Sequence, residues 1–250
     1  MFSFFKKNNC KSVNKENRQE LKAISDFKGI HKGKRCFIIG NGPSLKMEDL
    51  DKLKNEYCFG VNRIYLSFDE TEWRPSYYVI QDRNMLLNYV EEIEELDLPI
   101  KFVPGYMEEN FSNKKGNVFF YNYVRRLFDG SEAEFSFDVS NQTFEGGTVT
   151  YLCMQLAVYM GFTEIYLLGN DFTYSVEKTD EGIHVNPVQD YFSEKYITSG
   201  EKRFFPRIDL CQKGFEKALE ESKIHNFKIY NATRGGRLEV FERVDFDSLF

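Results

Sequence analysis

Short apolar runs alternate with stretches of helical periodicity along most of the chain. The runs of strand length are residues 36–39, 57–61, 77–80, 100–103, 118–121, 164–169 and 227–230. Apolar residues recur at helical spacing over residues 46–54, 84–96, 149–160 and 209–224. Strands that alternate with helices are typical of α/β proteins. The pattern predicts an α/β fold with a doubly wound, mostly parallel, Rossmann-like sheet.

Three stretches depart from this alternation. Residues 125–146 are polar and poorly periodic, which predicts an irregular excursion that forms a lid or a substrate wall. The polar connection 175–206 is too long for a plain connector and is expected to be a mobile functional loop. Residues 8–27 are expected to form a polar helix. We therefore divide the chain into a basic N-terminal arm or helix, residues 1–33, and one nucleotide-binding domain, residues 34–250.

The net charge of −6 is unevenly distributed. Residues 1–35 hold ten basic and three acidic residues, a surplus of seven positive charges, so the remainder carries thirteen negative charges. An acidic body argues against a nucleic-acid binder. The basic arm begins Met1-Phe2-Ser3-Phe4-Phe5-Lys6-Lys7 and could touch an anionic membrane surface, although a solvated leader is the simpler interpretation.

Cysteine usage and hydropathy bear on location. The five cysteines are odd in number and widely spaced, as expected of reduced thiols in a cytoplasmic protein. The sequence has no apolar stretch near the ~20 residues of a membrane-spanning helix, and its N-terminus lacks the apolar centre of a signal peptide. The predicted location is cytoplasmic, with peripheral contact at the inner membrane face through the arm.

A glycine-rich turn follows the first apolar run. Gly40 and Gly42 allow close backbone approach, and Asn41 between them can hydrogen-bond a ligand. Strand, glycine turn and helix together bring backbone N–H groups and the positive end of a helix dipole to an anion. The turn is neither a dinucleotide fingerprint nor a P-loop. A tight connection that binds nothing is the alternative.

Asn and Asp follow nearly every predicted strand. The positions are Asn41, Asn62, Asp82 with Asn84, Asn170 with Asp171, and Asn231. The carboxyl ends of parallel strands share one edge, so these side chains would line one crevice beside the helix start at Gly147 and Thr148. Amides offer a donor and an acceptor to base and ribose edges. Asn and Asp also favour turns after strands, but their repetition favours a nucleotide site.

Two motifs and the end of the chain resemble a known family. The stretches 38–45, 146–171 and 230–241 look like the hydroxymethylpterin diphosphokinase-like (MptE-like) family, over about residues 34–250. The first two are also similar to the bacterial sialyltransferases of glycosyltransferase family 42. That resemblance implies transfer of a sialic-acid-like (nonulosonic) sugar from its cytidine monophosphate (CMP) donor to a cell-surface glycan or protein acceptor, with no cofactor or metal required.

The sialyltransferase resemblance also implies roles for residues. Asn41, Gly42, Ser44 and Asn62 match donor-binding positions, whereas Asp82 replaces an Asn and Thr173 replaces a Tyr. His184 would be the base, since an ordinary His pKa of about 6.5 suits that task. The hydroxyls of Tyr174 and Tyr191 would meet the charge of the leaving phosphate. The full set assigned to the nucleotide is Gly40, Asn41, Gly42, Ser44, Asn62, Asp82, Gly147, Thr148, Asn170 and Asp171.

Two other classes of function remain open at this point. The family's namesake transfers diphosphate from ATP to a hydroxymethyl pterin, which needs Mg²⁺, and Asp82 and Asp171 could hold that ion. A non-catalytic nucleotide-binding or partner-docking protein is the third class, supported mainly by the N-terminal arm. The chain could also form a homo-oligomer.

Overall fold

An eight-stranded sheet forms the centre of the protein. The computed structural model describes residues 21–250, apart from 112–117, 128–129, 180, 187 and 198–205. All neighbouring strands of this sheet are parallel. Their spatial order is β12 (Glu242–Arg243), β11 (Lys228–Asn231), β8 (Glu164–Leu168), β1 (Arg35–Ile39), β2 (Cys58–Val61), β3 (Tyr77–Val79), β4 (Lys101–Pro104) and β5 (Val118–Tyr121). The predicted α/β, doubly wound, Rossmann-like fold is confirmed.

The strand order reverses between β1 and β8. The chain first builds outward from β1 through β2, β3 and β4 to β5, and later returns to the other side of β1 to add β8, β11 and β12. At their carboxyl ends, Ile39 lies opposite Leu168. Connections leave these two strands in opposite directions, so a crevice opens beyond their ends, where such sheets bind ligands.

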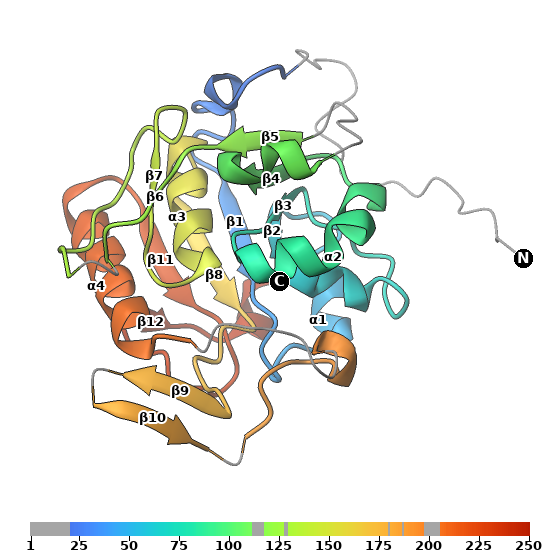
Figure 1. Ribbon diagram of the computed structural model, residues 1–250, viewed down its shortest axis with the longest axis vertical. Coiled ribbons are helices and arrows are strands. Elements are labelled where there is room, and N and C mark those ends of the chain that lie inside the picture. Colours follow the sequence, from blue (N-terminus) through green and yellow to red (C-terminus); the bar gives the residue numbers. More distant parts are fainter. Residues whose placement is uncertain (1–20, 112–117, 128–129, 180, 187, 198–205) are drawn as a thin grey trace, which may run out of the picture.

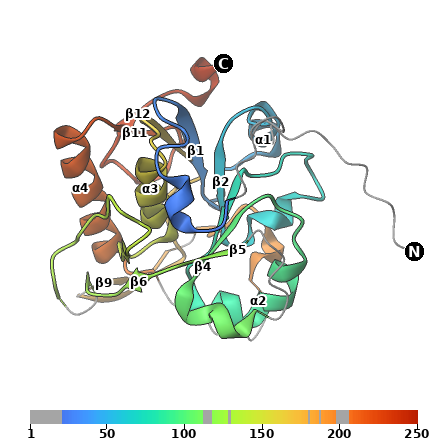
Figure 2. The same ribbon diagram turned by 90° about the horizontal axis from the view of Figure 1, so that it is seen from above.

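Helices cover both faces of the sheet (Figures 1 and 2). Helices α3 (Val149–Tyr159) and α4 (Ile208–Ile224) lie on one face, and α1 (Met47–Lys52) and α2 (Arg83–Glu95) lie on the other. Along β1, Cys36 and Ile38 pack into the core on the α3 side, whereas Phe37 and Ile39 pack into the core on the α1 side. Burial on both faces explains why β1 is a continuous apolar run.

The remaining elements are short. Among the described residues, the 3₁₀-helices are η2 (Ile24–Phe27), η3 (Asn62–Ser67), η4 (Gly105–Asn110), η6 (Glu194–Tyr196) and η7 (Phe246–Leu249). The excursion 125–146 is irregular where described, and β6 (Tyr123–Val124) pairs with β7 (Thr143–Phe144) at its two ends. The connection 175–206 contains the hairpin β9 (Val176–Thr179) and β10 (Gly182–Val185), which the sequence did not predict. Each strand of the hairpin has only four residues, which gives little pattern to detect within the long polar connection.

One local prediction is confirmed and one needs correction. Helix α1 spans Met47–Lys52, within the predicted helical stretch 46–54, and a turn at Pro43 and Ser44 precedes it. Of the predicted helix 8–27, residues 8–20 lie outside the described residues, and Ile24–Phe27 form a 3₁₀-helix instead of an α-helix. The proposed membrane contact of the arm also falls mainly on residues outside the described ones. No helix in the described part of the chain has the length and apolarity of a membrane span.

The described end of the N-terminal segment packs against the sheet domain. Phe27 is fully buried with its ring edge-on to Phe102 and Phe119. The backbone of residues 29–33 donates hydrogen bonds to carbonyls at the end of α3, including that of Met160. His31 is 5% exposed, stacks on Phe162 and hydrogen-bonds the Tyr77 hydroxyl through Nε2. Phe27 and His31 are therefore part of the core, whereas the residues between them are exposed.

His31 predicts an acid-sensitive fold. Burial, assisted by the nearby Lys34 charge, lowers the pKa of His31 from 6.5 to about 4. Because the unfolded chain then binds the proton more readily, stability falls as the pH drops from about 6.5 toward about 4, by up to roughly 3 kcal/mol. Urea unfolding of wild type and His31→Gln across this range measures the effect. The variant should show the flatter pH dependence, and equal slopes would contradict the assignment.

Candidate functional site

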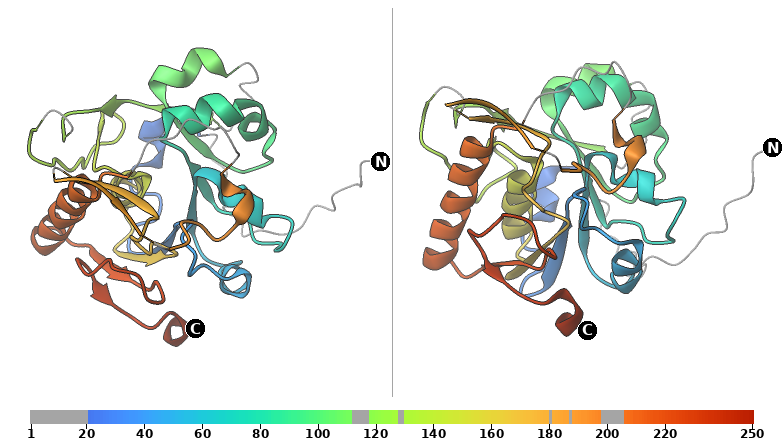
Figure 3. Two further views of the ribbon diagram at one scale, coloured as in Figure 1. Left: turned by 60° about the horizontal axis from the view of Figure 1, so that its bottom comes forward. Right: turned by 90° about the horizontal axis from the view of Figure 1, so that it is seen from below.

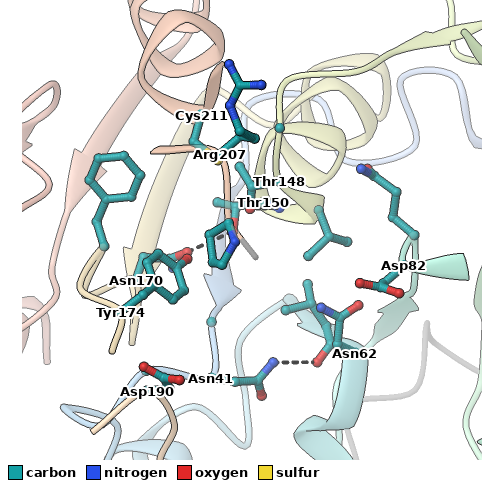
Figure 4. A pocket seen from close by; sticks show the side chains of 18 of the residues that line it. Asn41, Asn62, Asp82, Thr148, Thr150, Asn170, Tyr174, Asp190, Arg207 and Cys211 are labelled. Atoms are coloured by element: carbon teal, nitrogen blue, oxygen red, sulfur yellow. Dashed lines mark hydrogen bonds between the residues drawn. The ribbon is translucent and has the colours of Figure 1, made fainter. Parts of the chain in front are cut away.

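A cavity of about 550 Å³ opens at the carboxyl ends of the strands, at the point where their order reverses. Figure 4 shows side chains that follow β1, β2, β3 and β8, together with side chains at the start of α3, converging on it. Eleven of the thirteen residues predicted from the sequence line it. They are Gly40, Asn41, Gly42, Asn62, Asp82, Gly147, Thr148, Asn170, Asp171, Tyr174 and Tyr191. Ser44 lies behind them, and His184 does not line the cavity.

The floor of the cavity is a close contact between two turns. A side chain at Gly40 would place its Cβ 2.4 Å from the carbonyl oxygen of Gly169, far closer than real Cβ contacts. Gly40 N–H donates to the Leu168 carbonyl, and Gly42 N–H donates to that of Gly169. The expectation that the glycine turn offers N–H groups to an anion is therefore wrong for these two residues, because the neighbouring turn already uses them.

Asp171 clamps the same turn. Its Oδ1 accepts from Ser44 N at 3.2 Å and its Oδ2 accepts from Ser44 Oγ at 2.8 Å. A Cβ at Gly42 would lie within 2 Å of Oδ2, so this carboxylate requires glycine there. Burial raises the pKa of Asp171, and the Ser44 hydrogen bonds partly offset that shift. Ser44 and Asp171 thus hold the shape of the site from behind.

Asn170 is likewise occupied by the protein. Its Nδ2 donates to the carbonyls of Ile38 and Leu168, at 3.2 and 3.1 Å, and its Oδ1 accepts from Thr150 Oγ1 at 2.8 Å. One amide therefore joins β1, β8 and α3 (Figure 4). Each of its polar atoms has a partner, which indicates a structural role at the reversal point.

Three other amides leave acceptors unused at the cavity. Asn41 Oδ1, Asn62 Oδ1 and Gln81 Oε1 are buried and have no hydrogen-bond partner within the described part of the chain. Asn41 Nδ2 donates to the Val61 carbonyl at 2.9 Å, and Gln81 Nε2 donates to the Tyr123 hydroxyl at 2.7 Å, which orients both oxygens. Buried polar groups normally have partners. The three oxygens, which follow β1, β2 and β3, are placed to accept from a ligand.

The start of α3 lies at the other end of the cavity. Gly147 has φ of +72° and packs against the backbone of Cys211, and Thr148 caps the helix by accepting from Thr150 N. Arg207 and Lys178 line the same part of the cavity, with Arg207 hydrogen-bonded to Asp209 through Nε and Nη2. A helix N-terminus beside cationic side chains favours an anion such as phosphate.

The two carboxylates predicted for Mg²⁺ lie apart. Asp82 caps α2 by accepting from Met85 N at 3.0 Å, and it lies across the cavity from Asn170 and Tyr174 (Figure 4). Asp82 follows β3 and Asp171 follows β8, so the two are separated by three strand spacings, about 14 Å. Within the described residues no group of three or more His, Cys, Asp or Glu is placed to hold a metal ion. These residues do not form a shared cation site.

A segment of the long connection contributes Tyr191 and Tyr196 to the lining of the cavity. Its ribbon lies at the same end of the molecule as the hairpin (Figure 3). We call residues 191–197 the strap. Its Tyr191 and Tyr196 rings stack at 3.8 Å with an interplanar angle of 11°. Burial raises the pKa of the Tyr196 hydroxyl well above its ordinary value, and does the same for Tyr174. Both phenols stay protonated near neutral pH and can donate.

His184 is the site residue that the fold does not bring to the cavity. It lies on β10, whose residues are all exposed, and its Nε2 is 3.3 Å from the Thr179 hydroxyl on β9. The hairpin extends away from the strand ends (Figure 1). Its predicted role as base is therefore not matched by contact with the cavity in this conformation.

Sequence reasoning missed Gln81, Tyr196 and Arg207. Gln81 had a usable signal, since it directly follows the third strand and continues the series of strand-end amides begun by Asn41 and Asn62. Asp82 was chosen there instead, and it caps a helix. Tyr196 and Arg207 had no comparable signal, because only the path of the long connection places them at the cavity.

Fold and site together define a doubly wound α/β protein with a ligand cavity at the point of strand reversal. The sequence model of the 6-hydroxymethylpterin diphosphokinase MptE-like family matches residues 7–177. The chain belongs to this family. The matched range includes both glycine turns and ends within β9. A search of curated proteins found no match.

Two solved structures are similar. The MAf glycosyltransferase from Magnetospirillum magneticum AMB-1 is 16% identical with a TM-score of 0.53, over 92% of this chain and 38% of that one. The chain thus spans well under half the length of that protein, and the likeness establishes the fold alone. The sialyltransferase CstII from Campylobacter jejuni, in complex with CMP-3FNeuAc, is 16% identical with a TM-score of 0.44, over 84% of this chain and 86% of that one. A TM-score this low does not establish a shared fold.

The role of Asn170 predicts a stability effect. Asn170→Ala removes the donor to two carbonyls and the acceptor for Thr150, and unsatisfied buried groups cost roughly 1–3 kcal/mol. Urea unfolding should show a loss of that size. Asn226→Ala, at an exposed turn position, is the matched control and should change stability by less than about 0.5 kcal/mol. A stability of Asn170→Ala equal to that of the control would contradict the structural role.

Proposed function

We propose that this protein is a glycosyltransferase that uses a CMP-activated, sialic-acid-like sugar as donor and a cell-surface glycan or protein as acceptor. The observation that carries the proposal is the row of three unpaired amide oxygens at the ends of β1, β2 and β3. A cytosine amino group and ribose hydroxyls are donors of the kind these acceptors lack. The resemblance of the glycine turn to the sialyltransferases and the name of the MAf glycosyltransferase agree with this choice.

The other end of the cavity suits the phosphate. The start of α3, with Lys178 and Arg207 beside it, would meet the negative charge of the CMP phosphate. Tyr174 and Tyr191 line the cavity, and the raised pKa of Tyr174 keeps its hydroxyl as a donor. As the acceptor hydroxyl attacks the anomeric carbon, the bond from that carbon to the phosphate oxygen breaks. Preorganised donors at the departing phosphate stabilise this step.

The proton of the acceptor hydroxyl needs a base. We retain His184 for this role as part of the proposal, with the condition that the β9–β10 hairpin moves toward the cavity when the acceptor binds. Catalytic hydrogen bonds often form only in the substrate complex. Lys178 on β9 of this hairpin already lines the cavity. A small movement of the hairpin would therefore bring His184, on the neighbouring strand β10, closer to the cavity.

The second candidate is Mg²⁺-dependent diphosphate transfer from ATP to a hydroxymethyl pterin. Membership of the MptE-like family favours it. Asp82 and Asp171 are each used by the protein, as a helix cap and as a clamp on Ser44, and they lie on different sides of the cavity. Asp82 and Asp171 are therefore not placed to hold one Mg²⁺ together. The arrangement fits metal-independent binding of a nucleoside monophosphate better.

Titration calorimetry of the full chain separates the two candidates. CMP and ATP are each titrated with and without Mg²⁺. We expect CMP to bind without metal, and we expect Asn62→Ala to weaken its affinity about tenfold, equivalent to about 1.4 kcal/mol. Asn84→Ala, on α2 outside the cavity lining, is the matched control and should stay within twofold. ATP binding only with Mg²⁺, or binding of neither nucleotide, would contradict the glycosyltransferase proposal.

The role of His184 has its own test. His184→Ala should leave the affinity for CMP unchanged, because the side chain does not line the cavity. Turnover of a CMP-activated sialic acid, measured as CMP release, should fall about 10²- to 10⁴-fold if His184 is the base. Unchanged turnover would remove His184 from the mechanism and direct attention to the carboxylates that line the cavity.

A further inference from the structure

A buried arginine joins the strap to the end of β2. Arg63 is 5% exposed, although it follows a strand at the mouth of a cavity. Its Nη1 donates to the carbonyl oxygens of Lys195 and Tyr196, at 3.0 and 2.7 Å, and to the Tyr89 hydroxyl at 3.1 Å. The guanidinium also lies 3.8 Å from the centre of the Tyr89 ring. One side chain thus fixes the backbone of the strap to the body of the protein.

The conformation of the preceding residue directs Arg63 toward the strap. Asn62 has φ of +50°, which is uncommon for a residue other than glycine and is most often tolerated by Asn. This turn sends the chain from β2 into η3, so that Asn62 faces the cavity while Arg63 is buried beside it. Adjacent residues therefore serve the nucleotide site and the strap.

Asn41 connects the strap to the ligand end of the same cavity. Its carbonyl accepts from Phe192 N at 3.0 Å, and its Nδ2 donates to the Tyr196 hydroxyl at 3.1 Å. Its Oδ1 is one of the three buried oxygens without a partner. Asn41 therefore contacts the strap with two groups and is placed to contact a ligand with the third.

We propose that Arg63 is a positioning residue that holds the strap over the glycine turn, and that Asn41 couples strap closure to nucleotide binding. This inference rests on the proposed nucleotide site. With the strap in place, the Asn41 amide is oriented and Tyr191, stacked on Tyr196, forms the outer wall of the cavity. If nucleotide binding is tighter when the strap is ordered, then bound nucleotide also favours the ordered strap, because the coupling between the two is reciprocal.

The chain offers a matched control for Arg63. Arg74 also donates to backbone carbonyls, those of Thr71 and Trp73 at 2.9 and 2.7 Å, and it stacks over the Phe68 ring at 4.1 Å. It does not line the cavity, and none of these partners belongs to the strap. Arg63→Met and Arg74→Met thus remove chemically similar interactions, and among the hydrogen bonds named above only those of Arg63 reach the strap.

Hydrogen–deuterium exchange and calorimetry together test the inference. In the free proteins, Arg63→Met should speed exchange in peptides covering residues 191–197 at least tenfold, while Arg74→Met leaves these peptides unchanged. Arg63→Met should weaken CMP affinity at least tenfold, and Arg74→Met should stay within twofold. Saturating CMP should slow strap exchange in wild type. Arg63→Lys should be intermediate, because a single ammonium cannot reproduce the planar set of donors.

The outcomes are separable. If both arginine variants behave alike, or if Arg63→Met leaves strap exchange and CMP affinity unchanged, Arg63 is a structural residue and the inference is wrong. If Arg63→Met does not fold, Arg63→Lys replaces it, and a partial change in strap exchange and CMP affinity that Arg74→Lys does not show supports the inference. Tyr196→Phe keeps the stacked ring and removes only the hydroxyl that Asn41 Nδ2 contacts, so it tests the coupling through Asn41. If wild type does not bind CMP, the proposed function fails, while strap exchange in the free proteins still decides the positioning role.

Discussion

The contact between two backbone turns, Gly40 after β1 and Gly169 after β8, is the constraint on which the site depends. A Cβ at Gly40 would lie 2.4 Å from the Gly169 carbonyl, so the turns meet only without a side chain there. Asn170 and Asp171 then tie this junction to α3 and to Ser44. In a doubly wound sheet, a crevice forms where the connections of two neighbouring strands leave in opposite directions, here β1 and β8. The contact between the turns at Gly40 and Gly169 forms the bottom of this crevice.

Polar residues around the junction divide into two groups by the state of their hydrogen bonds. Asn170 and Asp171 have their polar atoms occupied by the protein, and they maintain the shape of the crevice. Asn41, Asn62 and Gln81 keep an acceptor without a partner in the described structure, and they face the cavity. Residue type alone does not separate the groups, since Asn occurs in both. The strap forms the outer wall of the crevice, because Arg63 and Asn41 hold it against the same strand ends.

Much of the fold was predictable because the strands of a parallel sheet that is covered on both faces are uninterrupted apolar runs in the sequence. The strands from β1 to β11 that lie inside the sheet were found in this way, and α3 was found because it is buried almost throughout. The hairpin was missed because each of its strands has only four residues, too few to stand out within a long polar connection.

The sequence by itself determined the fold class, the strand ends as the place of the site, and eleven of the residues that line the cavity. These follow from local patterns, since apolar runs mark strands and polar residues after them must gather at one edge. Only the tertiary structure decided which side chains are saturated, that Gln81 and not Asp82 continues the amide row, and that Arg63 reaches the strap. Hydrogen bonds between residues far apart in sequence depend on how the connecting segments run in space, and the path of these segments cannot be predicted from local sequence patterns.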